Sequence, residues 1–154
     1  MYMIIEQLIT SFISTAAFGI IFNAQKDSLI KCGIVGMSGW FIYVVMTNFG
    51  VDAVPASLAG SFIVALISQT FARMYKTPII IFNVAGIIPL VPGGLAYDAM
   101  RNFVENDYNL AISLAAKAGL ISGAIALGLV FSEVINQLIR KSKLPPKVYK
   151  RSRL

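Results

Sequence analysis

The sequence has no histidine and a single cysteine, Cys32, among its 154 residues. Without histidine, the chain lacks the side chain that most often serves as a general base or a metal ligand. One cysteine allows neither an intramolecular disulfide nor a cysteine-rich metal site. The sequence also has no glycine-rich phosphate loop and no pair of carboxylates well inside an apolar segment. We therefore expect no enzyme, no metal and no cofactor.

Charged residues are also scarce. They make up 13% of the chain, against roughly 25% in a typical soluble protein. Hydrophobic residues make up 57% and recur almost from end to end. A soluble domain of this length could not bury so much apolar surface. The composition predicts an all-α, polytopic membrane protein.

Five apolar segments can be drawn along the chain. Four of them reach the roughly 20 residues that span a hydrocarbon core of about 30 Å. The fourth segment is shorter and, at about 1.5 Å per residue, covers only about 21 Å as a helix. It either dips back to the side it entered from or crosses together with the helix that follows. The segments are 3–22, 29–49, 53–72, 78–91 and 110–129, the last running on to Ile139.

The basic residues favour five crossings. Lys26 and Lys31 follow the first segment, Arg73 and Lys76 follow the third, and seven of the thirteen basic residues lie in the last fifteen positions. The other two links are poor in lysine and arginine, and basic links favour the cytoplasmic side. This alternation predicts a cell-membrane protein with its N-terminus outside and its C-terminus in the cytoplasm. The predicted organisation is a five-helix transmembrane domain over 1–142 and a basic cytoplasmic tail over 143–154.

The fourth segment is interrupted by Pro89, Pro92, Gly93 and Gly94. Proline ends or kinks a helix, and glycine permits left-handed or extended backbone. We predict a helix end, a turn and a new amphipathic helix over 95–104. The free N–H groups at the start of that helix would suit a carboxylate, and secondary transporters use broken helices in this way. An ordinary turn at the membrane surface is the alternative.

Ionisable and polar residues near this break are further candidates. Asn83 either ties helices together or contacts a solute. Arg101 would attract a carboxylate and Asp98 an ammonium group or a proton, unless the two form a solvated pair three residues apart. Lys117 is either functional or extends its stem to the lipid headgroups. The predicted substrate-binding residues are Asn83, Pro89, Pro92, Gly93, Gly94, Tyr97, Asp98, Arg101 and Lys117.

Other features concern packing and helix ends. Gly33, Gly36 and Gly39 recur every three residues, and Gly119 and Gly123 form a GxxxG pattern. Such small residues let membrane helices approach closely, within one subunit or between subunits. The remaining carboxylates near segment ends, Glu6 and Glu133, are interpreted as interfacial, and Gln69 faces either the bundle or the inner boundary. Pro145 and Pro146 are expected to end the last helix.

Two stretches resemble a known family. The pattern IIPLVPGGLAYDAM at residues 87–100 is similar to the proline-glycine signature of the threonine/serine exporter family. The stretch FGIIFNAQKDSLIKCGIVG at residues 18–36, with the chain length and the five spans, resembles the small YjjB-like subunit of that family. The resemblance covers roughly residues 4–140.

The resemblance implies one half of a secondary transporter that exports threonine, serine or a related small carboxylate such as a dicarboxylate. It implies as partner a larger subunit with a similar five-helix membrane region and an extra N-terminal domain. Five spans are few to enclose a solute pathway, so pairing or self-association is expected. A non-transporting membrane assembly partner and a homo-oligomeric channel are the alternatives.

Overall fold

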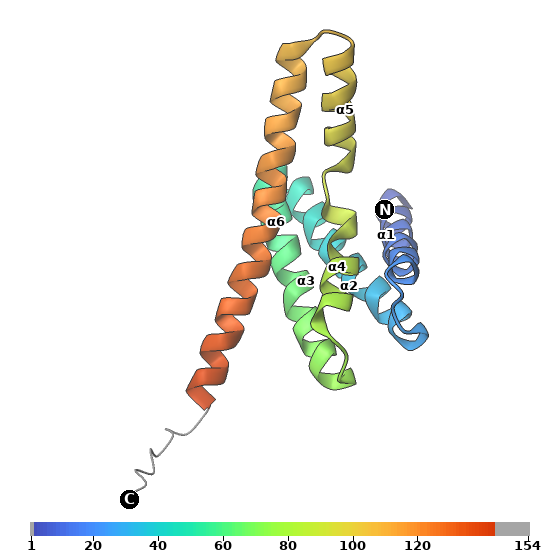
Figure 1. Ribbon diagram of the computed structural model, residues 1–154, viewed down its shortest axis with the longest axis vertical. Helices are drawn as coiled ribbons and strands as arrows, with labels where there is room; N and C mark the ends of the chain where they lie inside the picture. The colour runs from blue at the N-terminus through green and yellow to red at the C-terminus, as the bar shows by residue number, and fades with distance from the viewer. Residues whose placement is uncertain (1, 144–154) are drawn as a thin grey trace, which may run out of the picture.

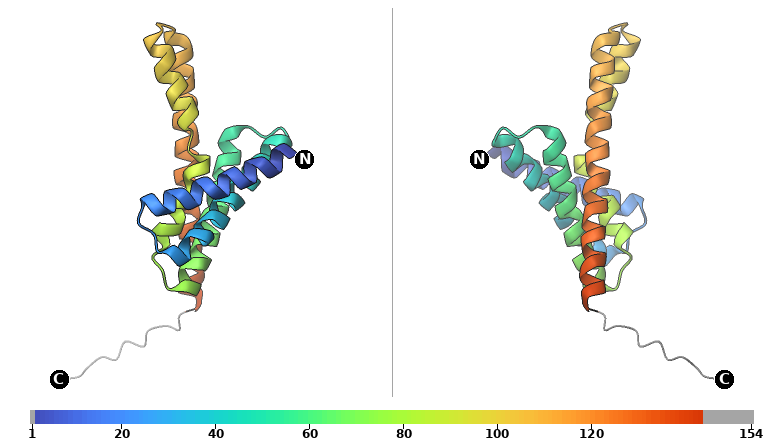
Figure 2. Two further views of the ribbon diagram at one scale, coloured as in Figure 1. Left: turned by 90° about the vertical axis from the view of Figure 1, so that its right-hand side faces the viewer. Right: turned by 90° about the vertical axis from the view of Figure 1, so that its left-hand side faces the viewer.

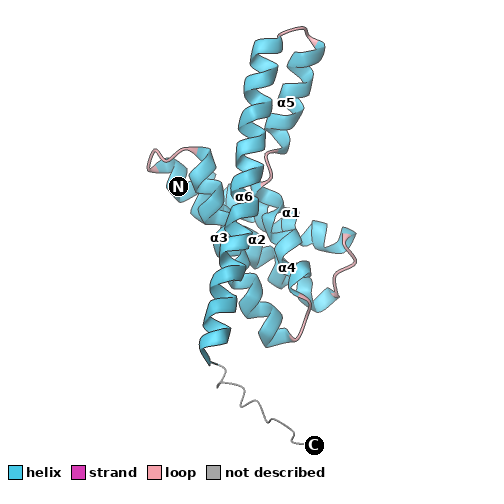
Figure 3. Cartoon of the chain, turned by 60° about the vertical axis from the view of Figure 1, so that its left-hand side comes forward, coloured by secondary structure: helices cyan, strands magenta, loops and turns pink. Residues whose placement is uncertain are grey.

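The computed structural model of the protein describes residues 2–143, and every regular element in that range is a helix (Figures 1 and 3). The predicted all-α fold is confirmed. The basic tail beyond Lys143, with Pro145 and Pro146, lies outside the described residues. The helices are α1 (Tyr2–Ile21), α2 (Lys26–Asn48), α3 (Ala53–Tyr75), α4 (Ile79–Ile87), the short 3-10 helix η1 (Ile88–Leu90), α5 (Gly93–Val104) and α6 (Tyr108–Lys143).

Four of these helices, α1, α2, α3 and α6, are long and apolar enough to cross a membrane. The remaining candidate is a pair of helical segments, Ile79–Leu90 and Gly93–Val104. The chain bends by 52° between them. Counting that pair as one span gives five, with the fourth broken where the prolines predicted it.

Contacts between side chains show which helix ends lie together. At one end, Lys31 Nζ lies 3.4 Å from the centre of the Tyr75 ring, and Arg73 donates a hydrogen bond to Asn136 of α6. At the other end, Lys117 Nζ lies 4.0 Å from Asp52 Oδ1. The bent pair therefore leads from the end that holds Tyr75 to the far end of α6, and does not return to where it began (Figure 1).

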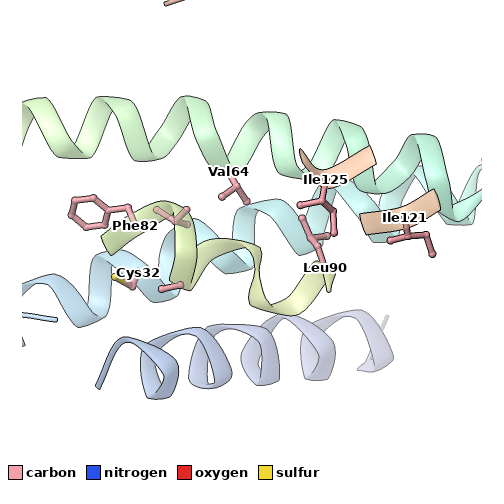
Figure 4. Packing of buried hydrophobic residues seen from close by; sticks show 8 residues of the cluster. Cys32, Val64, Phe82, Leu90, Ile121 and Ile125 are labelled. Atoms are coloured by element: carbon pink, nitrogen blue, oxygen red, sulfur yellow. The ribbon is translucent and has the colours of Figure 1, made fainter. Parts of the chain in front are cut away.

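The core lies where α2, α3, α4 and α6 meet (Figure 4). Phe82 of α4 is fully buried, and its ring packs edge-on against Phe71 of α3 with centroids 6.0 Å apart. Leu90 of η1 reaches the same cluster, so the first half of the broken span is anchored inside the bundle. The buried members are Cys32, Val35, Val64, Phe82, Ala85, Leu90, Ile121 and Ile125.

Glycines bring α1, α2 and α3 close together. A Cβ added at Gly33 would lie 2.5 Å from the Phe12 ring of α1, and one at Gly60 would lie 3.0 Å from the Gly39 carbonyl oxygen. The predicted close approach is confirmed for these helices. At Gly119 and Gly123 the same added atom meets nothing within 4 Å in the part of the chain that the structure describes.

The last two helices form a hairpin that projects from the bundle. α5 packs mainly against α6, and both extend beyond the ends of α2 and α3 (Figure 2). With 36 residues, α6 is about 54 Å long, well beyond a hydrocarbon core of about 30 Å. Asp107 starts α6 by accepting a hydrogen bond from the Leu110 backbone N–H at 3.2 Å.

Candidate functional site

The break in the fourth span is made by its prolines. After α4, Pro89 lies within η1, Val91 is extended (φ −64°, ψ 128°), and α5 begins at Gly93 directly after Pro92. The new helix therefore starts two residues earlier than predicted. Gly93 and Gly94 are its first two residues and, within residues 2–143, the one glycine with a positive φ is Gly50. The glycines thus do not use the left-handed backbone that they permit.

The start of α5 is exposed, and one of its backbone N–H groups already donates a hydrogen bond within the turn. The Gly93 N–H donates to the Val91 carbonyl oxygen at 2.8 Å. A Cβ added at Gly93 or Gly94 would meet no described atom within 4 Å. The glycines therefore leave open space at the helix start, while the first N–H group there is satisfied by the turn itself.

The other predicted residues near the break fall in separate places. Tyr97, Asp98 and Arg101 are exposed on the projecting hairpin. Arg101 Nε lies 2.9 Å from Glu105 Oε1, so its ion-pair partner is one turn onward, not Asp98. Lys117 is exposed and lies near Asp52 in the α2–α3 link. The structure gathers Tyr97 and Arg101 around one shallow hollow of about 290 Å³, which Pro89 does not line.

Asn83 lies in α4 and is half-buried. Its side-chain oxygen Oδ1 is buried and accepts no hydrogen bond from the described residues. A buried polar atom without a partner is costly in an apolar bundle. No contact therefore supports the interpretation that Asn83 ties two helices together, and its buried oxygen has no partner among the described residues.

A larger hollow opens beside Pro89. It has a volume of about 410 Å³ and lies between α1, Trp40 of α2 and Pro89 of η1. We call it the polar groove; its lining residues are Glu6, Gln7, Thr10, Ser11, Ser14, Trp40 and Pro89. Of the predicted site residues, Pro89 is the one that lines it.

The polar groove follows one face of α1. Its five polar residues on that helix, at positions 6, 7, 10, 11 and 14, have the spacing of a single helical stripe. Exposed isoleucines that suit lipid lie on the adjoining side of the helix, next to Glu6, namely Ile5, Ile9, Ile13 and Ile20. Sequence reasoning missed this site because it treated Glu6 as an isolated residue near a helix end, and the polar spacing that follows Glu6 was the signal that could have identified it.

Two polar groups of the polar groove have no partner among the described residues. Ser11 is 5% exposed and its Oγ makes no hydrogen bond, and the buried Trp40 Nε1–H has no acceptor. Buried polar groups are normally paired, so an unpaired donor in a hollow indicates an absent partner. A second hollow of about 350 Å³ shares Gln7 and Trp40 and continues along α1 and α2 past Tyr43 and Thr47.

The family model described as threonine/serine exporter, ThrE, matches residues 7–135. The chain belongs to the threonine/serine exporter family. The matched range begins at Gln7 of the polar groove, one residue after Glu6, and runs through the broken span and most of α6. No solved structure matches the chain.

Membership of the exporter family supports a transporter-type function in a membrane rather than an enzyme. The helices agree with this assignment, since four or five of them could cross a bilayer. Among the residues that the structure describes, no group of three or more acidic, cysteine or histidine side chains could hold a metal ion. The residues that line the polar groove offer hydroxyl, amide and indole groups and one carboxylate.

Proposed function

We propose that this protein is a subunit of a secondary transporter that exports threonine, serine or a related small carboxylate such as a dicarboxylate. The observation that carries the proposal is the meeting of the broken span with the polar groove at Pro89. Irregular backbone at membrane depth is tolerated where it lines a wet cavity or is buried in protein. Transporters place solute sites at such breaks.

The polar groove also supports a shared role with a second subunit. It is open on one side, and a carboxylate with several hydroxyl groups facing lipid would be costly. We propose that the larger five-span subunit of the same family, or a second copy of this chain, covers the groove and completes the pathway. The open face at Gly119 and Gly123 supports close contact with another helix.

The proposed orientation places the N-terminus outside and the C-terminus in the cytoplasm. Lys31 and Arg73 lie at the end of the molecule to which the C-terminal part of α6 runs. Basic residues favour the cytoplasmic side. In this orientation the polar groove begins near the outer end of α1 at Glu6 and reaches inward to Pro89.

In this proposal Pro89, Pro92, Gly93 and Gly94 shape the solute pathway, and Asn83 offers its free oxygen to solute or water. In the proposed orientation the outer end carries Tyr97, Asp98, Arg101 and Lys117, which would guide the solute as it leaves.

Efflux of labelled threonine and serine tests the proposal, in cells that express this chain with the larger family member of the same genome. The test variant is Gly93→Leu, Gly94→Leu, because an added Cβ at either position would meet no described atom within 4 Å. We expect it to assemble normally and to lose most efflux, while the Gly93→Ala, Gly94→Ala control retains it. Normal export by the leucine variant would count heavily against a solute path at the break. Absence of efflux from the unaltered pair would favour a non-transporting assembly partner.

A further inference from the structure

We propose that the polar groove is a binding site for a solute that carries a primary ammonium group, and that the Glu6 carboxylate contacts that group. The inference rests on the proposed function and deepens it, because it states which chemical group of the solute this subunit recognises. It also distinguishes between the two substrate classes, amino acid and dicarboxylate, that the transporter proposal leaves together.

The residues that line the polar groove carry one negative charge and no positive charge. Glu6 is the one charged side chain among the residues that line the polar groove and its continuation past Tyr43. Two basic residues considered for the solute are engaged elsewhere, since Arg101 pairs with Glu105 and Lys117 lies by Asp52. Glu6 is exposed, and a carboxylate that shares its hollow with no basic side chain attracts a cation and repels a second carboxylate. The groove therefore suits an amine or a zwitterion and not a dicarboxylate.

The polar groove also has polar side chains that can still form hydrogen bonds. Thr10 already donates to the Glu6 carbonyl oxygen at 2.8 Å, which leaves its lone pairs free to accept. Ser11 Oγ and Trp40 Nε1 have no partner among the described residues. An indole N–H can only donate, so it fits a carboxylate or hydroxyl oxygen. The polar groove thus combines an acceptor for an ammonium group on α1 with donors for oxygen on α1 and α2.

The shape of the polar groove agrees with this assignment. Its volume of about 410 Å³ falls within the range of small-molecule sites. Gln7 and Ser14 add side chains that can both donate and accept, on the same helix face as Glu6. A small amino acid with a hydroxyl group would match this arrangement, with water filling the remaining space.

The chain provides its own probe of binding, because Trp40 is its single tryptophan and lines the polar groove. The full-length protein in lipid nanodiscs is titrated with four compounds, and tryptophan fluorescence is read together with binding of radiolabelled threonine. The compounds are threonine, 1-amino-2-propanol, which lacks the carboxylate, 3-hydroxybutyrate, which lacks the amine, and succinate. We expect saturable responses to the first two, and little or none to the last two at the same concentrations.

The matched variants are Glu6→Gln and Glu133→Gln. Glu133 is also a glutamate on a membrane helix, but it accepts a hydrogen bond from Gln137 and lies outside the polar groove. A hydrogen bond to a charged group is worth enough that its loss weakens binding about tenfold or more. We therefore expect Glu6→Gln to bind threonine about tenfold more weakly, and Glu133→Gln to bind it as the unaltered chain does.

Equal binding by Glu6→Gln, equal binding of succinate, or absence of saturable threonine binding by both readouts would overturn the inference. These results are distinguishable from failure of the transporter proposal. Efflux that persists with an unchanged KM in Glu6→Gln leaves the transporter intact and removes this site. Threonine binding that depends on Glu6, without any efflux, supports the site and removes the transport function.

Discussion

Several hydroxyl side chains in the described helices bond within their own helix, whereas the Gln69 amide bonds to another helix. Thr70 and Ser38, for example, donate to backbone carbonyls four residues earlier. Gln69 of α3 instead donates to Ser132 Oγ of α6 at 3.1 Å, and both residues are buried. This bond joins the helices whose contact holds the projecting hairpin to the bundle.

Replacing Ser132 with alanine should therefore destabilise the bundle. We expect a loss of about 0.6 kcal/mol and at most about 1.7 kcal/mol, the range measured for hydrogen bonds between membrane helices. Reversible unfolding in mixed micelles measures the change. Ser122→Ala is the matched control, because Ser122 lies on the same helix but bonds to its own Ala118 carbonyl oxygen. Equal losses in the two variants would show that the contact between helices adds nothing.

At this scale the sequence predicts residue types better than residue partners. The two options for Gln69 were both consistent with its position, and the bundle contact depends on Ser132, which is 63 residues away. Arg101 could pair with an acidic residue three or four positions away, and helix geometry permits both. Glu6 shows the opposite case, since its role depends on neighbours whose spacing was already visible in the sequence.

At the scale of elements, α1 is held against α2 through glycine contacts. A Cβ at Gly33 would meet the Phe12 ring at 2.5 Å, so a side chain at this position requires the ring to move. Gly33→Leu should separate α1 from α2, at a cost of about 1–3 kcal/mol, and should also disturb the polar groove that the two helices share. Gly119→Leu is the control, since its site is open within the described chain.

Unfolding measurements on these two variants check the expectation. Only Gly33→Leu should lower stability, and a Gly119→Leu chain should fold normally while its cross-linking to neighbouring subunits decreases. Comparable instability of both variants would contradict the idea that the two glycine sets serve different contacts.

The local sequence of the broken span determines where the helix is interrupted, but not how strongly the span bends. Pro89 and Pro92 remove N–H groups and clash with preceding carbonyls, so an interruption between them follows from local chemistry. The 52° bend and the projection of α5 away from the bundle do not. They depend on Leu90 being held between α2, α3 and α6 and on α5 packing along α6, contacts between residues distant in sequence.

At the scale of the whole molecule, the five-span arrangement places the basic links between helices at one end of the bundle. The links poor in lysine and arginine lie at the other end. Phe49, in the α2–α3 link, is 84% exposed, and Gln25, in the α1–α2 link, is exposed at the other end. Cys32 is fully buried, so the unaltered chain provides a background without an accessible thiol. Single cysteines at positions 49 and 25 can therefore report which end faces outward.

In intact cells a membrane-impermeant maleimide should label Phe49→Cys, and Gln25→Cys should react only after the membrane is permeabilised. The physical reason is the preference of Lys26, Lys31, Arg73 and Lys76 for the cytoplasmic side. Labelling of Gln25→Cys from outside, with Phe49→Cys protected, would reverse the orientation and would place the Glu6 end of the polar groove in the cytoplasm. Labelling of both from outside would require that α2 does not cross the membrane.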